Sequence, residues 1–372
     1  MDFSLTDDQQ ELAGLAARIL EDRMTLQHLK ARDCSDDWYD LDTWRELAKA
    51  NVVGVGFPES AGGLGLAFLD LCMVLREIGR NVAPLPAIPT LVAAGLPIAR
   101  FGTDAQRAIL SKVVAGDVLL TAALVEAGAD PGHPTTIATR DGDSWRIDGV
   151  KSNTAAASAA ELILVPAAVD DRVGLFLVPS NAAGISVTRQ KTTNHEPLFE
   201  VALQGVRVGD DAVLGTIDEG HDILTWTLNR VTVAMCAIVS GVADRAMRLT
   251  AQYTCDRKQF DRAIGTFQAV GQRMADCFID NQAIELTMLQ AATHLDEGRD
   301  DAIEVATAKF WAAEGGNHIG HAALHIHGGI SIDVDFPIHR YFLWLKQYEF
   351  SLGSATPELL KIGAVLAEET KA

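Results

Sequence analysis

The chain has 372 residues, with 31 Lys and Arg against 50 Asp and Glu, a formal net charge of −19 and 48% hydrophobic residues. This composition supports a buried core and excludes intrinsic disorder, and the length indicates two or three domains. The acidic balance argues against nucleic acid or an anionic membrane surface as the main partner, because phosphate groups attract clustered Lys and Arg.

The N-terminus and the cysteines indicate the cellular compartment. Residues 1–8 contain neither a basic n-region nor an apolar h-region, and no run of about 18 consecutive apolar residues occurs, so neither a secretory signal nor a membrane span is expected. The five cysteines are scattered without a Cys-x-x-Cys pair, which argues against a disulfide framework or a zinc site. We expect a cytoplasmic protein with reduced thiols and no metal.

Residues from about 5 to 115 are predicted to be helical. Thr6 precedes two acids and then apolar residues at helical spacing, which is typical of a capped helix. The glycine-rich segment 57–65 is expected to be a loop. Further amphipathic runs predict helices at 44–50, 69–79 and 105–114.

From about 117 to 215 the pattern changes to short apolar runs separated by turn residues. Asp141-Gly142-Asp143 and Asp148-Gly149 indicate hairpin turns. We expect a small β-barrel or orthogonal sandwich here. The predicted strands fall near 118–124, 145–150, 162–169, 173–178, 185–187, 199–203 and 206–208, with a bend between the last two.

The helical period returns at about 219. Gly328-Gly329 is expected to end one long helix, and a last helix is expected after Gly353-Ser354. The pattern favours a four-helix bundle. The long helices are predicted at 221–255, 264–290 and 301–327, and the domains at 1–116, 117–218 and 219–372.

Three sequence strings carry a resemblance to a known family. Tyr253–Gln268 reads Tyr-Thr-Cys-Asp-Arg-Lys-Gln-Phe-Asp-Arg-Ala-Ile-Gly-Thr-Phe-Gln, and it resembles the Tyr…Arg-x-x-Phe-Gly…Phe-Gln signature of the acyl-CoA dehydrogenases. His327-Gly328-Gly329-Ile330 resembles their Gln-x-x-Gly-Gly turn, and 57–65 resembles their Pro-Glu…Gly-Gly-x-Gly loop. The matches keep the family's order and spacing over essentially the whole chain.

This resemblance implies an α+β fold with an N-terminal helical domain, a middle β-domain and a C-terminal four-helix bundle. It also implies FAD as cofactor and an acyl-CoA thioester as substrate. A carboxylate removes the α-proton while hydride passes from Cβ to the flavin, and electrons then leave through an electron-transfer flavoprotein in most members. The α-proton is weakly acidic, so the reaction needs a polarised thioester carbonyl and a dry site.

The catalytic base is the first departure from the family pattern. The family glutamate that precedes the Gly-Thr pair falls on Leu352, and a leucine cannot accept a proton. A minority of members place the glutamate just before an arginine that corresponds to Arg230, and here that residue is Asn229. Glu349 lies one helical turn before Leu352 and is the substitute to consider, with a surface glutamate as the alternative.

The flavin-facing part of the β-domain is the second departure. Val125–Pro131 keeps Glu126 and a glycine of the family's Thr-Glu-Pro-x-x-Gly-Ser-Asp string but loses a hydroxyl. Segment 151–157 lacks the large aromatic side chain that usually packs on the flavin ring. An aromatic platform contributes on the order of 1 kcal/mol beyond burial, so its loss weakens a flavin site unless another segment supplies the wall.

The residues that serve a neighbouring subunit's FAD in the family are retained. An arginine fork suits phosphate, an amide can donate and accept, and glycines let backbone N–H groups approach the cofactor. The alternatives are a surface salt bridge for the arginine and ordinary turn glycines. The implied cofactor contacts are Arg257, Gln259, Phe260, Ile264, Gln268, Gly328 and Gly329.

This chain lacks its own base and its own flavin wall but keeps these contacts. A non-catalytic partner subunit would show this pattern. The pattern resembles the heteromeric α2β2 acyl-CoA dehydrogenases of actinobacteria, most of which act on CoA thioesters of steroid side chains. The expected partner is a homologous chain that carries the glutamate. Two alternatives stay open, a self-sufficient homotetramer that uses Glu349 and a flavin-free acyl-CoA-binding or scaffolding protein.

Three further side chains have open roles. Arg230 is expected either to contact a CoA or adenine group or to pair with a carboxylate such as Asp222 or Glu126. His325 and His327 occupy the Gly-Gly turn, where they are expected to alter hydrogen bonding to the adenosine; no third ligand clusters with them to form a metal site.

Overall fold

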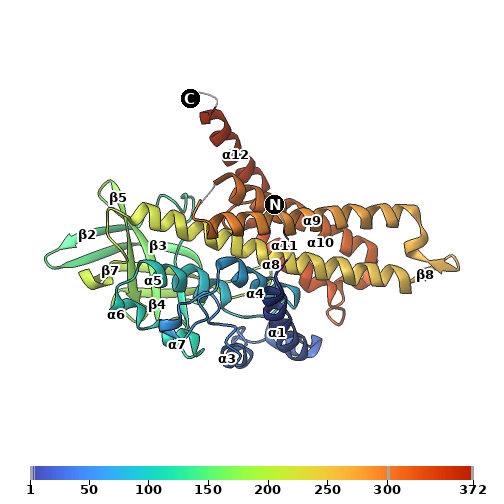
Figure 1. The fold of residues 1–372 in the computed structure, drawn as a ribbon, viewed down its shortest axis with the longest axis horizontal. Helices are drawn as coiled ribbons and strands as arrows, with labels where there is room; N and C mark the ends of the chain where they lie inside the picture. Colours follow the sequence, from blue (N-terminus) through green and yellow to red (C-terminus); the bar gives the residue numbers. More distant parts are fainter. Residues whose placement is uncertain (1–2, 4, 300–301, 370–372) are drawn as a thin grey trace. The chain divides into compact units, whose positions relative to one another are not determined.

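The structure is a computed structural model that describes residues 3, 5–299 and 302–369. The chain runs from helices through a β-sheet and back to helices, which confirms the predicted fold class (Figure 1). Its described residues form two compact units, a helical unit (1–37, 68–84 and 232–372) and a sheet unit (38–67 and 85–231). The domain boundaries given above stay a prediction, because these units group segments by contact rather than by chain order.

The N-terminal helix begins as expected. The Thr6 side chain accepts the N–H of Gln9 while the Gln9 side chain accepts the N–H of Thr6, which closes a capping box. The single helix predicted at 105–114 is wrong, since two short helices replace it. The helices of this part are α1 (Asp7–Arg23), α2 (Leu26–Asp33), α3 (Leu41–Lys49), η1 (Glu59–Ala61), α4 (Phe68–Arg80), the π-helix η2 (Ile88–Gly95), α5 (Leu96–Phe101), α6 (Asp104–Arg107) and α7 (Leu110–Val114).

The sheet unit contains one seven-stranded mixed sheet in the order β1-β4-β2-β3-β7-β6, with β5 added on β4. The β1–β4 and β2–β4 pairs are parallel, and the others are antiparallel. The strands are β1 (Leu120–Ala122), β2 (Ile137–Asp141), β3 (Ser144–Ala155), β4 (Leu162–Val169), β5 (Arg172–Pro179), β6 (Ile185–Gln190) and β7 (Leu198–Gly209), followed by the 3-10 helix η3 (Asp210–Ala212).

The core of this sheet is apolar. Ile147, Val165, Phe176 and Val201 are fully buried at its centre. The Asp141-Gly142-Asp143 hairpin is confirmed, because Asp141 pairs with Ser144.

One turn prediction in this region was wrong, and the bend predicted between the last two runs was confirmed. The turn expected at Asp148-Gly149 is a register shift inside β3, where the Asp148 carboxylate accepts the N–H of Gly205 at 2.7 Å. The two runs expected as separate strands form the single strand β7, which bends at Gly205 with a left-handed φ of 63°. A β-bulge absorbs the change in register, so the chain does not turn back.

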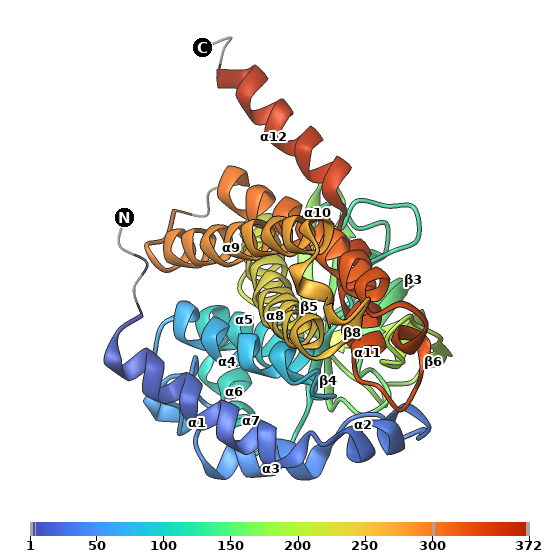
Figure 2. The ribbon, with the colours of Figure 1, turned by 90° about the vertical axis from the view of Figure 1, so that its right-hand side faces the viewer.

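The C-terminal helices form most of the helical unit. α10 contacts α9, α11 and α12, and Figure 2 shows α12 extending beyond the other helices of this unit. The helix predicted from 264 begins at Gln268, after a 3-10 turn. The elements are α8 (Gly220–Asp256, which begins in the sheet unit), β8 (Lys258–Gln259), β9 (Arg262–Ala263), η4 (Ile264–Thr266), α9 (Gln268–Asp296), α10 (Ala302–His327), η5 (Gly328–Ile332), α11 (Ile338–Phe350) and α12 (Ala355–Glu369).

Two glycines bring α4 and α8 into backbone contact. A Cβ on Gly241 would lie 1.8 Å from the carbonyl oxygen of Arg76, and a Cβ on Gly79 would lie 2.1 Å from that of Ile238. Only glycine permits this approach. α8 is long and apolar enough to span a membrane by composition, but 72% of its most apolar window is buried inside the protein, as in a core helix.

Candidate functional site

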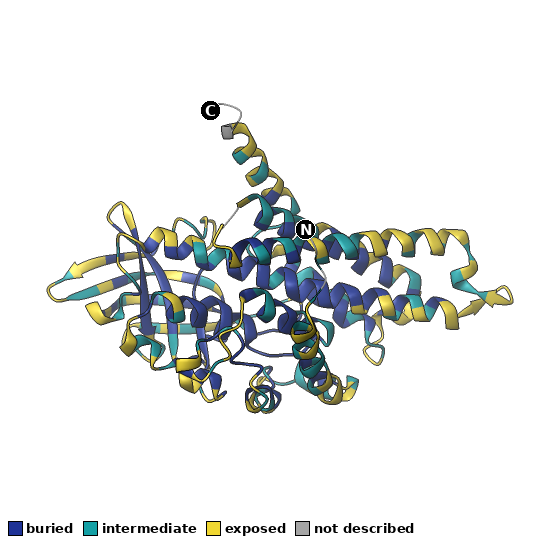
Figure 3. Ribbon diagram, in the orientation of Figure 1, coloured by how far each residue is buried: buried dark blue, intermediate teal, exposed yellow. Residues whose placement is uncertain are grey.

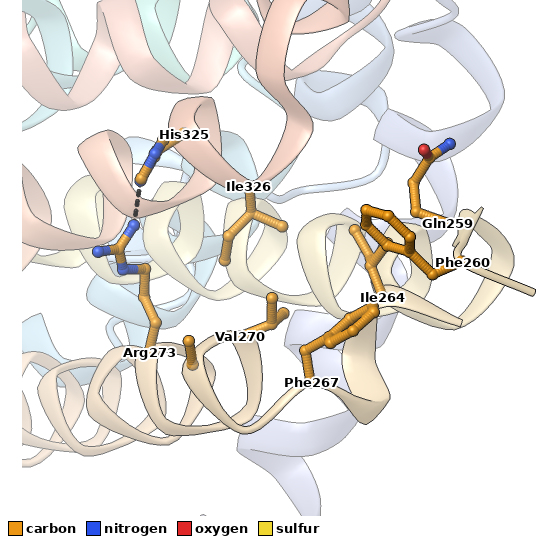
Figure 4. A pocket seen from close by; sticks show the side chains of 9 residues that line it. Gln259, Phe260, Ile264, Phe267, Val270, Arg273, His325 and Ile326 are labelled. Atoms are coloured by element: carbon orange, nitrogen blue, oxygen red, sulfur yellow. Dashed lines mark hydrogen bonds between the residues drawn. The ribbon is translucent and has the colours of Figure 1, made fainter. Parts of the chain in front are cut away.

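A pocket of about 430 Å³ lies within the helical unit, between the hairpin β8–β9, the first turns of α9 and the last turn of α10 (Figure 4). Its middle is apolar, and its two ends are polar. Figure 4 shows Gln259 at one end and the Arg273–His325 pair at the other. The lining residues are Gln259, Phe260, Ile264, Phe267, Ala269, Val270, Arg273, His325 and Ile326.

The hairpin that forms one wall is strained at its tip. Phe260 and Asp261 both have left-handed φ values, 51° and 62°, which a two-residue type I′ turn requires and which non-glycine residues adopt at a cost. The N–H of Ile264 donates to the carbonyl of Arg257 at 2.9 Å and closes the base of the hairpin. The turn leaves Phe260 88% exposed, in a hairpin that is mostly exposed (Figure 3).

Aromatic contacts lie at the hairpin end of the pocket. Phe267 at the start of α9 packs edge-on against Phe260, with 6.3 Å between ring centroids. The Arg262 guanidinium lies over the outer face of Phe267, 4.0 Å from its centroid. A cation over an aromatic face stabilises this arrangement by about 0.5–1 kcal/mol at an exposed site, so Phe267 is a fixed wall.

The inner end of the pocket is built from two helices. Arg273 projects from α9, and its guanidinium donates to Nδ1 of His325 on α10. Two residues further on, His327 is buried, its Nδ1 bonds the Ala323 carbonyl at 2.8 Å, and its ring stacks on Tyr253. Burial lowers the pKa of His327, so the neutral ring acts as a packing element beneath the Gly-Gly turn.

The implied cofactor residues divide into two groups. Gln259, Phe260 and Ile264 line the pocket, whereas Arg257, Gln268, Gly328 and Gly329 flank it on the adjoining chain ends. Gly328 has a left-handed φ of 64°, and a Cβ on either glycine would meet no heavy atom within 4 Å, so their backbone faces open space. Within the described part of the chain Arg257 forms no ion pair, which argues against the surface salt bridge that sequence left open.

Sequence reasoning missed part of the lining. Phe267 and Val270 were not among the predicted cofactor contacts, but both are half-buried and line the pocket. Arg273 was not singled out. Its spacing of three residues from Val270 places it on the same helical face, which is the pattern that could have identified it.

The positions considered for the base differ in their surroundings. Leu352 lies between α11 and α12 with a left-handed φ of 53°, and Asn229 lies on the part of α8 that belongs to the sheet unit. Glu349 on α11 accepts a hydrogen bond from Lys346 at 2.6 Å, and its side chain is 15% exposed. Glu349 is therefore already engaged in a short ion pair.

The two segments that the resemblance predicts to face the flavin meet in the sheet unit. The N–H of Ser152 donates to the carbonyl of Val125, and Lys151 Nζ lies 2.5 Å from Glu126 Oε1. Burial would raise the pKa of Glu126, but hydrogen bonds from Lys151 and Thr135 and the ammonium charge hold it at about 2. Glu126 thus has a structural partner.

Arg230, for which Glu126 was one suggested partner, makes a cation–π contact. Its guanidinium lies over the ring of Trp226, 3.8 Å from the centroid, on the same helix α8. No group of three His, Cys, Asp or Glu side chains that could hold a metal ion occurs among the residues that the structure describes.

The chemistry around the pocket suits a dinucleotide such as FAD. The apolar middle matches a planar heterocycle, and the flanking arginine and amide groups supply hydrogen-bond donors for phosphate. The open glycine backbone at 328–329 leaves room for a cofactor to approach without a Cβ in the way. The residues present therefore fit part of an FAD molecule.

Comparisons with known proteins cover the whole chain. Family profiles for the N-terminal, middle and C-terminal domains of acyl-CoA dehydrogenases match residues 6–117, 125–206 and 218–366. Acyl-CoA dehydrogenase FadE27 of Mycobacterium tuberculosis is 37% identical over 377 residues, which is 99% of both chains.

Two solved structures are similar in fold and sequence. A variant of the steroid acyl-CoA dehydrogenase Tcur3481-Tcur3483 gives a TM-score of 0.93 at 42% identity, with coverage of 98% of this chain and 99% of that chain. A chain of the ChsE4-ChsE5 complex of Mycobacterium tuberculosis gives a TM-score of 0.94 at 38% identity, with coverage of 99% of each. The protein belongs to the acyl-CoA dehydrogenase family of flavoprotein oxidoreductases, whose members use FAD.

Proposed function

We propose that this chain is the non-catalytic subunit of a heteromeric FAD-dependent acyl-CoA dehydrogenase. The observation that carries the proposal is a contrast within one chain. Leu352 and Asn229 occupy the two positions where the family places its base, and neither side chain can take a proton at neutral pH. In contrast, Gln259, Phe260 and Ile264 line a pocket, and Arg257 and Gln268 lie on the adjoining chain segments.

The chain contributes binding and exclusion of water. FAD, when bound, accepts the hydride that leaves the acyl chain. Arg257 and Gln268 would offer charged and neutral N–H donors to its phosphates, and the glycines at 328 and 329 would leave room for its ribose. Phe260 and Ile264 would pack against its adenine end and exclude water there. The glutamate that removes the α-proton belongs to the partner chain.

The relatives support the choice of partner and substrate. The two similar solved structures bear paired names, one of a complex and one of a steroid acyl-CoA dehydrogenase. We infer a homologous chain as partner, in an α2β2 assembly, and a CoA thioester of a steroid side chain as substrate. Electrons pass on to an electron-transfer flavoprotein, and the complex is cytoplasmic.

The stoichiometry of flavin tests this proposal. The chain purified alone is expected to be colourless and inactive, and co-expression with its homologous partner should give a yellow complex with one FAD for each pair of chains. Absorbance of the released flavin against total protein measures the ratio. One FAD on every copy of this chain alone, together with turnover, would overturn the proposal.

The Glu349→Gln variant separates this proposal from a self-sufficient enzyme. In the complex we expect unchanged kcat, because Glu349 is held in a short ion pair with Lys346 and does not act as the base. Glu46→Gln is the matched control, since Glu46 forms an i,i+3 pair with Lys49 on α3. Lost turnover with retained flavin in Glu349→Gln alone would identify Glu349 as the base.

A further inference from the structure

Two helices of the helical unit present large apolar side chains to solvent that neither the core nor the proposed function uses. We propose that α12 of one copy of this chain packs on α9 of a second copy, and that the contact is reciprocal about a two-fold axis. Because both helices belong to this chain, the inference does not depend on which chain carries the catalytic base. The side chains concerned, between 42% and 69% exposed, are Phe278, Ile279 and Leu286 on α9 and Leu359, Leu360 and Leu366 on α12.

α12 carries more apolar side chains than its own chain covers. Figure 2 shows the helix extending beyond the other helices of this unit, and Figure 3 shows that most of its length is exposed. Its first turn buries Glu358, but Leu359 and Leu360 in the same turn are exposed. A helix of 15 residues gains most of its stability from packing an apolar face, so we expect α12 to lie against another surface in the assembled protein.

The apolar side chains of α9 have the same spacing as those of α12. Ile279 and Leu286 are seven residues apart on α9, and Leu359 and Leu366 are seven residues apart on α12. Seven residues make about two helical turns, so the members of each pair share a face and lie about 10 Å apart along the axis. Helices with this repeat pack side by side, as in a coiled coil.

The α9 stripe also has room for incoming leucines. Ala275 lies four residues before Ile279, and Ala283 lies four residues after it, so the three side chains share one face of the helix. Small side chains next to a large one leave gaps on a helix surface. Leucines of a facing helix fill such gaps as knobs in holes.

A second copy of this chain is the occupant that these stripes fit. In both ribbon views α12 leads away from α9 of its own chain, so it does not cover that stripe itself (Figure 1, Figure 2). A chain that displays two apolar stripes of matching spacing is self-complementary. About a two-fold axis, each copy then covers α9 of the other copy with its own α12.

The exposed apolar area is sufficient for a stable pair. With roughly 200 Å² for a whole large apolar residue, half exposure leaves about 600 Å² on the six side chains of one copy. Two copies together would bury about 1,200 Å², which is the lower limit for a standard stable interface. Both stripes are needed to reach this value, which favours the reciprocal contact over a single one.

Disulfide cross-linking between marked copies tests the contact. One copy carries Ile279→Cys and a first affinity tag, the other carries Leu359→Cys or Leu366→Cys and a second tag, and both are co-expressed with the homologous partner. Oxidation should join the two tags in one band. Each variant mixed with wild-type copies is the control, because Cys34 and Cys255 are exposed in every copy. No band with either α12 variant, or a cross-link to the homologous partner instead, would overturn the proposal.

The mass of the assembled particle is a second readout. Ile279→Glu and Leu359→Glu should each raise the dissociation constant between copies at least 10-fold, because each buries a carboxylate in an apolar contact. Both positions are exposed in the single chain, so its folding stays intact. Leu66→Glu, at an exposed leucine outside the two stripes, is the matched control and should leave the mass unchanged.

Light scattering over a dilution series measures this dissociation. Wild-type mass at every dilution in both glutamate variants would refute the contact, and so would a wild-type particle that holds a single copy of this chain. Neither result alters the ratio of flavin to protein, which tests the proposed function separately.

Discussion

Replacing Lys151 by Met should destabilise the sheet unit strongly. The Lys151 ammonium is fully buried, 2.5 Å from Glu126 Oε1 and 2.6 Å from the carbonyl oxygen of Pro166. Removing one partner of a buried ion pair leaves the other charge uncompensated and costs about 3–5 kcal/mol. The backbone N–H groups of Thr135 and Thr136 still donate to the carboxylate, so we expect the lower end, about 3 kcal/mol.

The assay is the free energy of unfolding from urea titrations, followed by far-UV circular dichroism. Lys49→Met is the matched control, because Lys49 is exposed and its pair with Glu46 contributes below about 0.5 kcal/mol. Adding Glu126→Gln to Lys151→Met removes the stranded charge and should recover part of the loss. A change below about 1 kcal/mol in Lys151→Met would refute the reasoning that a buried charge is left unpaired.

Acid provides an independent check on the same pair. The pKa of Glu126 is about 2 in the folded protein against 4.5 for the ordinary side chain. A depressed carboxyl pKa contributes stability above pH 4.5 that is lost as the pH falls through about 2. We expect this acid loss to be smaller in Lys151→Met, because the ammonium no longer holds the pKa down.

Three other changes give distinct outcomes. Burial raises the pKa of Glu196 to about 7, so the folded state keeps this carboxyl protonated over a pH range in which the unfolded chain has lost the proton. The free energy of unfolding should therefore fall by about 3 kcal/mol as pH rises from 4.5 to 7. Glu196→Gln should abolish this pH dependence in urea titrations at several pH values. Asp261→Gly relieves the left-handed turn and should slow hydrogen exchange of the hairpin amides about fivefold by mass spectrometry, and faster exchange would contradict the strain argument. Gly241→Ala should cost more than about 2 kcal/mol in a urea titration, whereas Gly363→Ala on α12, where a Cβ meets nothing, should leave stability unchanged or higher.

The sequence predicted the fold class because helical and strand periods change sharply along the chain. Thr6 predicted the start of α1 because its capping box is local in sequence, and α10 ends before Gly328, as expected. Asp148-Gly149 misled because a bulge and a turn use the same residue types. Only the opposite strand, through the N–H of Gly205, decides between them, and that partner is distant in sequence.

The lining of the pocket could be predicted from sequence only where short local strings encode it. Gln259, Phe260 and Ile264 follow one another in a short segment, so the motif captured them together. The pairing of Arg273 with His325 joins two helices through residues 52 positions apart, and no local period reports such a contact. Likewise, the ion pair between Lys346 and Glu349 is seen only in the three-dimensional structure.

The exposed tip of the β8–β9 hairpin has a consequence for how the protein is produced in the cell. Phe260 presents an aromatic ring to water from a turn that is itself strained, so the lone polypeptide carries unfavourable free energy that association can release. In the proposed heteromeric complex the partner chain would cover this ring, so we expect copies of the chain in excess of its partner to be prone to self-association.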